Sequence, residues 1–105
     1  MNVSQTDPPE VTCQSVYIVH INTSLQIRCH IDAFPLPPLI TWSKKETGKV
    51  VKNGPGNYFD IAKTGITDEG IYICTATNLM VDFNNRSQGG TGSCMMNVTV
   101  VCEYK

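Results

Sequence analysis

Cysteine is the residue type with the most chemical potential in this sequence. No two cysteines form a Cys-x-x-Cys pair, and His20 and His30 do not lie at zinc-site spacings from them. We therefore expect two disulfide bonds and one remaining thiol, and no zinc site. Disulfides persist in oxidising compartments, so the cysteine content favours an extracellular protein. The five cysteines are Cys13, Cys29, Cys74, Cys94 and Cys102.

The histidines and carboxylates do not form a catalytic pattern. Catalysis needs a nucleophile, an oriented base and a site that stabilises developing charge. His30 is expected on the polar face of a strand and His20 near a strand end, with no serine or cysteine motif beside either. Asp60, Asp68 and Glu69 are close in sequence, but strand alternation directs Asp60 and Glu69 to solvent. We predict a protein that is not an enzyme and uses no cofactor or metal.

Four sequons also indicate an extracellular protein. An Asn-x-Ser/Thr sequence is the acceptor for N-linked glycosylation, and four in a short chain exceed what chance usually gives. Sugars would also keep a surface with few charges soluble. The acceptor residues are Asn2, Asn22, Asn85 and Asn97.

A lysine cluster is the main charged feature. Lys44, Lys45, Lys49 and Lys52 follow one another closely, and Glu46 is the acidic residue among them. The functional interpretation is a patch for heparan sulfate or another acidic partner, although an ordinary solvated hairpin has the same composition.

The composition bounds the remaining classes. The chain has 105 residues, room for one domain, with 16 % charged residues and a net charge of -1. Without an overall basic field, nucleic acid is not an expected partner. Apolar runs are only a few residues long, so any membrane anchor is expected outside this segment. The first residues have neither the basic nor the apolar region of a signal peptide.

The elements that must position these residues are strands. Short alternating runs are separated by turn residues every eight to twelve positions, and no long segment keeps the 3.6-residue period of a helix. In one such run Ile27 and Cys29 alternate with Arg28 and His30. An all-β sandwich is predicted, with strands over 17–21, 25–32, 39–44, 49–52, 58–61, 70–77 and 94–101.

At this point the residues resemble a known family. Cys29, then Trp42, then Asp68-Glu-Gly70-Ile-Tyr72-Ile-Cys74 is similar to the signature of the immunoglobulin superfamily. The resemblance implies a two-sheet Greek-key sandwich in which Trp42 packs over a bridge between the sheets. It also implies that the Tyr72 hydroxyl bonds back to upstream backbone.

The resemblance also implies a disulfide pairing. Cys29 and Cys74 would bridge the facing sheets, and closing that loop would contribute on the order of 4 kcal/mol. Cys13 and Cys94 would begin the first and last strands at the same end, as in receptors of the interleukin-receptor type. The competing pair is Cys13–Cys102. Cys94 and Cys102 lie about 26 Å apart along one strand at roughly 3.3 Å per residue, so they cannot bridge each other.

Details of the sequence resemble the intermediate set (I-set) of the superfamily. The Pro-rich bend over residues 33–38 and the segment Thr75-Ala76-Thr77-Asn78 carry this likeness. Two features depart from the family pattern. Thr64 stands where an apolar residue is usual, and no arginine between Val50 and Asp68 is available to pair with Asp68.

Three regions are candidate contacts with a partner. They are the Pro-rich bend, the lysine-bearing hairpin, and the long connection over residues 78–93, which could alternatively extend the flanking strands. A glycan on Asn97 would obstruct part of the sheet face on the last strand. The candidate contact residues are Pro35, Pro37, Lys44, Lys45, Lys49, Leu79 and Phe83.

The sequence therefore predicts an immunoglobulin-like recognition domain over residues 10–103. Residues 1–9 are expected to be an incoming linker and 104–105 an exit toward another domain. The expected function is adhesion or self-recognition by homophilic binding at the cell surface or in a secreted protein. The alternatives are a heterophilic receptor domain that binds a different protein and a structural spacer, and the fold alone does not decide among them.

Overall fold

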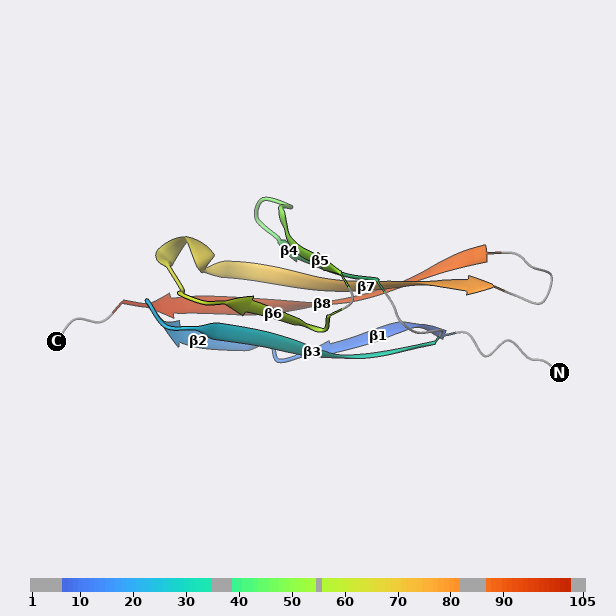
Figure 1. The fold of residues 1–105 in the computed structure, drawn as a ribbon, viewed down its shortest axis with the longest axis horizontal. Helices are drawn as coiled ribbons and strands as arrows, with labels where there is room; N and C mark the ends of the chain where they lie inside the picture. The colour runs from blue at the N-terminus through green and yellow to red at the C-terminus, as the bar shows by residue number, and fades with distance from the viewer. Residues whose placement is uncertain (1–6, 35–38, 55, 82–86, 103–105) are drawn as a thin grey trace.

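Two β-sheets make up the protein in a computed structural model that describes residues 7–34, 39–54, 56–81 and 87–102. One sheet has three strands in the order β1-β3-β6, and the other has five in the order β2-β8-β7-β4-β5 (Figure 1). The chain is all-β, as predicted. The strands are β1 (Asp7–Cys13), β2 (Val16–His20), β3 (Leu25–Phe34), β4 (Leu39–Lys44), β5 (Val50–Gly54), β6 (Tyr58–Ile61), β7 (Gly70–Val81) and β8 (Ser87–Val101).

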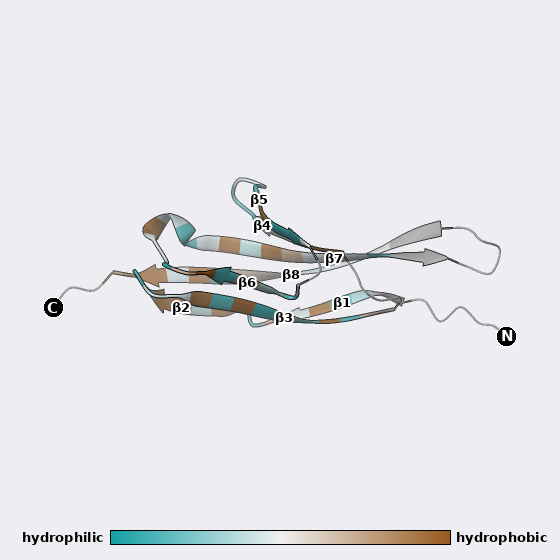
Figure 2. Ribbon diagram, in the orientation of Figure 1, coloured by the Kyte–Doolittle hydropathy of each residue, from teal (hydrophilic) through white to brown (hydrophobic). Residues whose placement is uncertain are grey.

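Alternation along the strands sorts side chains between core and solvent. In β8, Met96, Val98 and Val100 are buried, whereas Asn97 and Thr99 are exposed. In β3, Ile27 and Cys29 are buried between exposed polar neighbours, and Figure 2 shows this alternation as bands of opposite hydropathy. Because successive side chains in a strand point to opposite faces, each strand gives one face to the space between the sheets.

Aromatic packing fills the centre of the sandwich. Trp42 of β4 is fully buried and stacks on Phe59 of β6, with ring centroids 6.0 Å apart. Phe59 in turn lies 5.8 Å from the ring of Tyr72 on β7. These rings come from both sheets, so their burial joins the two layers.

The beginning of the chain contributes to both sheets. β1 pairs antiparallel with β3, and β2 then pairs parallel with β8. β1 begins at Asp7, so it includes residues that the sequence analysis assigned to an incoming linker. β1 also passes close to β8, where a Cβ on Gly92 would collide with the carbonyl oxygen of Pro9. A glycine at position 92 lets the two backbones approach.

The long connection between the last two strands is a tall hairpin. β7 and β8 stay paired from Gly70 opposite Val98 to Val81 opposite Ser87. Figure 1 shows this hairpin extending toward the end of the molecule where β1 begins. The structure therefore has the extension of the flanking strands, and a partner contact through Leu79 and Phe83 stays a prediction.

A single 3-10 turn, η1 (Ile66–Asp68), joins β6 to β7. In the part of the chain that the structure describes, no helix has the length and apolarity needed to cross a membrane.

Candidate functional site: an outer sheet face above a cysteine layer

A tyrosine anchors the start of β7. The Tyr72 hydroxyl donates to the carbonyl oxygen of Asp68 at 2.5 Å, and the Asp68 carboxylate accepts the Gly65 backbone N–H at 2.8 Å. This is the backward bond that the resemblance implies. Burial, with the nearby charges of Asp68 and Glu46, raises the pKa of Tyr72 to about 12. Asp68 therefore organises the turn through hydrogen bonds with Gly65 and Tyr72. The family pattern has an arginine as the partner of this aspartate.

The unusual threonine at position 64 has a polar role. Thr64 is fully buried, and its hydroxyl donates to the carbonyl oxygen of Thr23 at 2.6 Å. The Thr64 backbone N–H donates to the same oxygen, and Asn22 donates its N–H to the Thr64 carbonyl. These bonds join the β2–β3 turn to the loop after β6, so a threonine serves where the family usually has an apolar residue.

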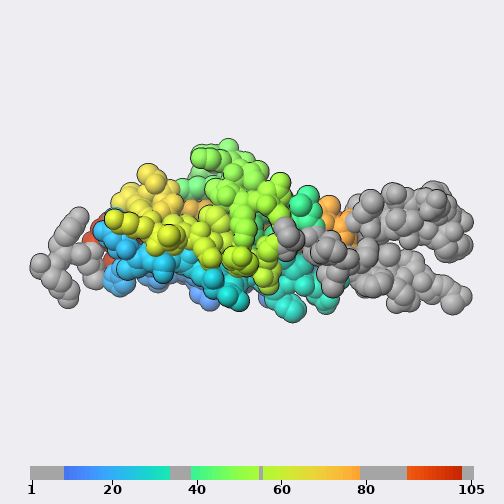
Figure 3. Space-filling model, viewed as in Figure 1, coloured from blue at the N-terminus to red at the C-terminus, as the bar shows by residue number. Residues whose placement is uncertain are grey.

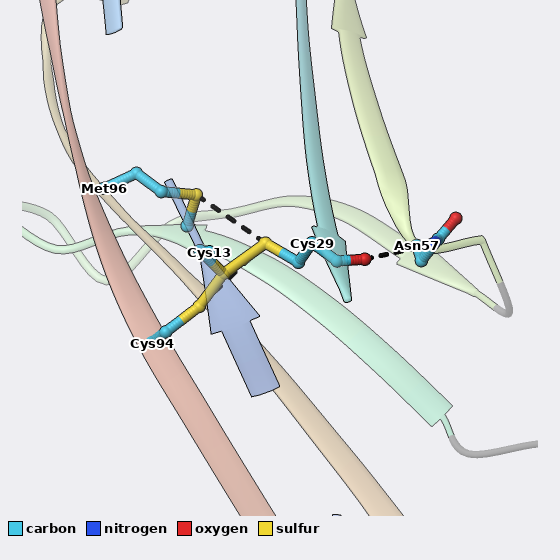
Figure 4. The surroundings of a disulfide bond; sticks show 5 residues. All are labelled: Cys13, Cys29, Asn57, Cys94 and Met96. Carbon is cyan, nitrogen blue, oxygen red and sulfur yellow. Dashed lines mark hydrogen bonds between the residues drawn. A yellow bond between two sulfur atoms is a disulfide. The ribbon is translucent and has the colours of Figure 1, made fainter. Parts of the chain in front are cut away.

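Four cysteines lie in one layer of the sandwich. Cys13 and Cys29 are direct neighbours across β1 and β3, and Cys74 and Cys94 are direct neighbours across β7 and β8. The Cys13 sulfur is linked to the sulfurs of both Cys29 and Cys94, as Figure 4 shows. A sulfur forms one disulfide bond, so these two links are alternatives. Cys13 meets Cys94 in the middle of β8, not at the end of the molecule that the sequence analysis expected.

The predicted bridge between Cys29 and Cys74 is not formed in this structure. Cys29 is turned toward its cross-strand neighbour Cys13, with 4.6 Å between their Cα atoms, and the Cys74 thiol is buried and unbonded. Burial raises the pKa of Cys74 to about 11. If Cys13 pairs with Cys94, Cys29 and Cys74 are the cysteines left in this layer. The Cys29–Cys74 pairing therefore stays a prediction. Cys102 is exposed just after β8.

Metal binding by this layer would need reduced cysteines. The sulfurs of Cys13, Cys29 and Cys94 lie within 4.8 Å of one another, close enough to surround a thiophilic ion. Thiolates are the ligands in such sites, and any disulfide among the three removes two of them. The layer is suited to disulfides in an oxidising compartment.

The histidine and acidic candidates stay dispersed. His30 is exposed on β3, on the outer side of the three-stranded sheet. A surface hollow beside β3 and β6 contains Asp60 as its ionisable group. Nothing around that hollow assembles the acid, base and nucleophile of an active site. The residues that line it are Ser24, Leu25, Gln26, Asp60, Ile61 and Ala62.

The outer face of the five-stranded sheet carries apolar side chains in addition to those of the core. Met95 of β8, Ile73 of β7 and Ser43 of β4 follow one another across the sheet, and Val50 of β5 lies opposite Ser43. Met95 is 53 % exposed and Val50 is 52 % exposed, and Leu39 adds a third exposed apolar side chain on β4. We call the set Leu39, Ser43, Val50, Ile73 and Met95 the outer sheet surface. None of these residues was among the predicted contacts, because strand alternation gives the face of each residue but only the register brings them side by side.

Two lysine side chains of the β4–β5 hairpin, which lies beside this surface, contact neighbouring parts of the fold. Lys44 donates to the carbonyl oxygen of Thr67 and lies over the ring of Tyr72. Lys52 donates to the carbonyl oxygen of Tyr58 at 2.6 Å and lies over that ring. Two of the four clustered lysines therefore contact other elements, Lys44 the turn η1 and Lys52 the strand β6, while Lys45 and Lys49 are exposed.

An acidic side chain fixes the same hairpin to β7. The Glu46 carboxylate accepts the Ile71 backbone N–H at 3.1 Å. Hydrogen bonds from the Glu46 and Ile71 backbone N–H groups lower the pKa of Glu46. Figure 3 shows the β4–β5 hairpin, in green, standing out from the body of the molecule.

The other predicted contacts and sequons fall in different places. Asn22 is exposed in the β2–β3 turn with a positive φ of 70°, and Asn97 is exposed on the outer face of β8. The backbone of Leu79 lies in β7 opposite Gly89. Outside the described residues are Asn2, Pro35, Pro37, Phe83 and Asn85.

Comparison with known families matches residues 8–78 to the immunoglobulin domain model. Among curated relatives, mouse Hemicentin-2 is 33 % identical over 84 residues, which cover 74 % of this chain and 2 % of that protein. The chain therefore spans a very small part of the relative's length.

Solved structures share the fold at low sequence identity. The N-terminal four Ig domains of Dscam1 isoform 1.9 match with a TM-score of 0.69 and 16 % identity, over 91 % of this chain and 22 % of that one. The RIG-5 IG1 homodimer matches with a TM-score of 0.66 and 10 % identity, over 90 % of this chain and 99 % of that one. A complex of Dpr2 Ig1-Ig2 with DIP-Theta Ig1-Ig3 matches with a TM-score of 0.67 and 19 % identity, over 90 % of this chain and 32 % of that one.

Proposed function

Because the chain belongs to the immunoglobulin domain family, we propose that it is a non-catalytic extracellular recognition module that binds a second copy of itself. The sequons and the layer of four cysteines support the extracellular placement, since both belong to secretory proteins. Two of the signature residues, Trp42 and Tyr72, are buried in the core. Asp68 accepts a hydrogen bond in the turn before β7, and Gly70 begins β7 with a positive φ of 146°. These residues serve the fold, and the outer faces of the sandwich are available for recognition.

The outer sheet surface is the observation that carries this proposal. Val50 and Met95 are about half exposed although both are large and apolar, and Ile73 lies between their strands. Exposed apolar side chains that share one face of a soluble domain are a common feature of interaction sites. A net charge of -1 opposes the approach of two copies only weakly.

Two structural neighbours illustrate both modes of binding on this fold. RIG-5 IG1 is a homodimer, and Dpr2 is in complex with DIP-Theta. These likenesses extend to the fold alone, so the choice of partner for this chain depends on its own surface. A heterophilic receptor domain is the alternative. The exposed Lys45 and Lys49 beside the outer sheet surface favour it, because they would suit an acidic partner. The same two lysines would be the contacts for heparan sulfate.

Sedimentation velocity over a concentration series tests self-association. The glycosylated chain is compared with Cys102→Ser, which removes dimers linked through the exposed thiol. We expect a reversible dimer in both forms. A strict monomer at all concentrations would contradict homophilic binding by this domain, as would a dimer that Cys102→Ser abolishes.

A matched pair of substitutions places the contact. Val50→Asp puts a charge on the outer sheet surface, whereas Ile66→Asp puts the same charge on η1, where Ile66 is 56 % exposed. We expect Val50→Asp to abolish the dimer and Ile66→Asp to retain it. Equal effects of the two changes would contradict the assignment of this surface.

A further inference from the structure

The Asn97 sequon lies in the middle of the last strand. Asn97 and Thr99 are exposed on the outer face of β8, and Val98 between them is fully buried. Both residues that an N-glycosylation signal requires therefore face solvent on one side of the sheet. The acceptor nitrogen is accessible there without any change in the core.

The strand beside this sequon exposes apolar side chains. β2 is the edge of the five-stranded sheet, and Val16 and Ile18 lie next to Asn97 and Thr99 in register. Val16 is 49 % exposed and Ile18 is 70 % exposed. An exposed apolar edge strand invites edge-to-edge pairing, and natural sheets usually protect such an edge with charge or a cover.

We propose that an N-linked glycan on Asn97 covers this edge, the strip formed by Val16 and Ile18. Neighbouring strands are about 5 Å apart, so the first sugar on Asn97 begins one strand away from both apolar side chains. The C–H faces of pyranose rings can then pack on the strip while the hydroxyls face water. The covered strip would explain why a large apolar residue such as Ile18 stays solvent-facing in a chain with few charges.

The cover also divides the outer face into two parts. Ile71 of β7 lies on the other side of Asn97, so the glycan occupies the β2–β8 part of the face. Val50, Ser43 and Leu39 lie on β4 and β5, at the opposite edge of the same sheet, whereas Met95 of the outer sheet surface lies on β8 two residues before Asn97 and borders the glycan. A partner would therefore dock from the β4–β5 side. The inference rests on the extracellular placement in the proposed function, but not on the identity of the partner.

Two substitutions at one position test the cover. In a chain produced by a secretory host, Thr99→Ala removes the sequon and Thr99→Ser keeps it, and both change the same exposed strand position. Glycopeptide mapping is expected to find sugar on Asn97 in the wild type and in Thr99→Ser, and none in Thr99→Ala. With the strip uncovered, we expect roughly two- to threefold more binding of a hydrophobic fluorescent dye to Thr99→Ala. Adding Ile18→Ser to Thr99→Ala should return the dye signal to the wild-type level.

Enzymatic removal of glycans from the folded wild type provides a second measurement that needs no substitution and should raise dye binding in the same way. Sugar on Asn22 with none on Asn97 would overturn the cover and leave the extracellular placement intact. A chain without sugar on any of the four sequons would count against both the cover and the extracellular placement. Unchanged dye binding after loss of the Asn97 glycan would also overturn the proposal, as would dimerisation of the glycosylated chain through Ile18.

Discussion

Replacing Tyr72 by phenylalanine tests the main polar anchor of the fold. The substitution keeps the ring that packs against Phe59 and removes the hydroxyl that donates to the Asp68 carbonyl at 2.5 Å. A hydrogen bond of this kind contributes a net 0.5 to 1.5 kcal/mol, and the half-buried carbonyl left without its donor adds to the loss, so we expect about 1–2 kcal/mol of destabilisation.

Thermal unfolding followed by circular dichroism measures the loss. For a domain of about 100 residues, each kcal/mol corresponds to a fall in Tm of about 4 to 8 °C. The matched control is Tyr58→Phe, because the Tyr58 side chain is 41 % exposed and its ring contact with Lys52 survives the change. Equal melting temperatures for Tyr72→Phe and Tyr58→Phe would refute the assigned role of the Tyr72 hydroxyl.

Three further predictions address pH, packing and disulfides. The pKa of Tyr72 is raised to about 12 in the folded chain, so the unfolded chain loses its proton first. The free energy of unfolding should therefore decrease between pH 10 and pH 12, and it should decrease less in Tyr72→Phe. Denaturant titrations at several pH values measure this, and parallel pH profiles of the two proteins would contradict it. Gly92→Ala should cost about 1–3 kcal/mol, because its Cβ meets the Pro9 backbone, while Gly65→Ala, whose Cβ has room, should be nearly neutral by the same titration. Peptide mapping without reductant should recover Cys13 joined to Cys94. Recovery of Cys13 joined to Cys29 would contradict the expected pairing of Cys13 with Cys94 and of Cys29 with Cys74, because Cys13 and Cys29 lie in the same sheet.

Strand alternation and aromatic spacing made the sandwich predictable. The buried set in β8 follows from the alternation of Met96, Val98 and Val100 with polar residues, because the two faces of a strand differ in solvent access. The position of Trp42 in the core likewise follows from its spacing relative to Cys29 and Cys74. These features depend on local sequence and on one family signature.

Features set by register between distant strands were harder to predict. The family resemblance implied the Cys13–Cys94 pair, but the position of Cys13 directly beside Cys29 depends on the register of β1 against β3, which no local pattern specifies. The packing of distant elements also makes Lys44 a link from β4 to η1 and Lys52 a link from β5 to β6, where the sequence suggested only surface charges. The outer sheet surface could not be predicted for the same reason. Ile73 and Val50 are far apart in sequence, and they come together on the outer face of the sheet only because β4 pairs with both β5 and β7.

Bead aggregation measures homophilic recognition most directly. Beads coated with the glycosylated Cys102→Ser chain present many copies, so a weak reversible contact is amplified by multivalency. We predict that coated beads cluster with one another, that Val50→Asp beads stay dispersed, and that Ile66→Asp beads cluster like the parent. Coated beads that stay dispersed at every density would contradict homophilic recognition by this domain.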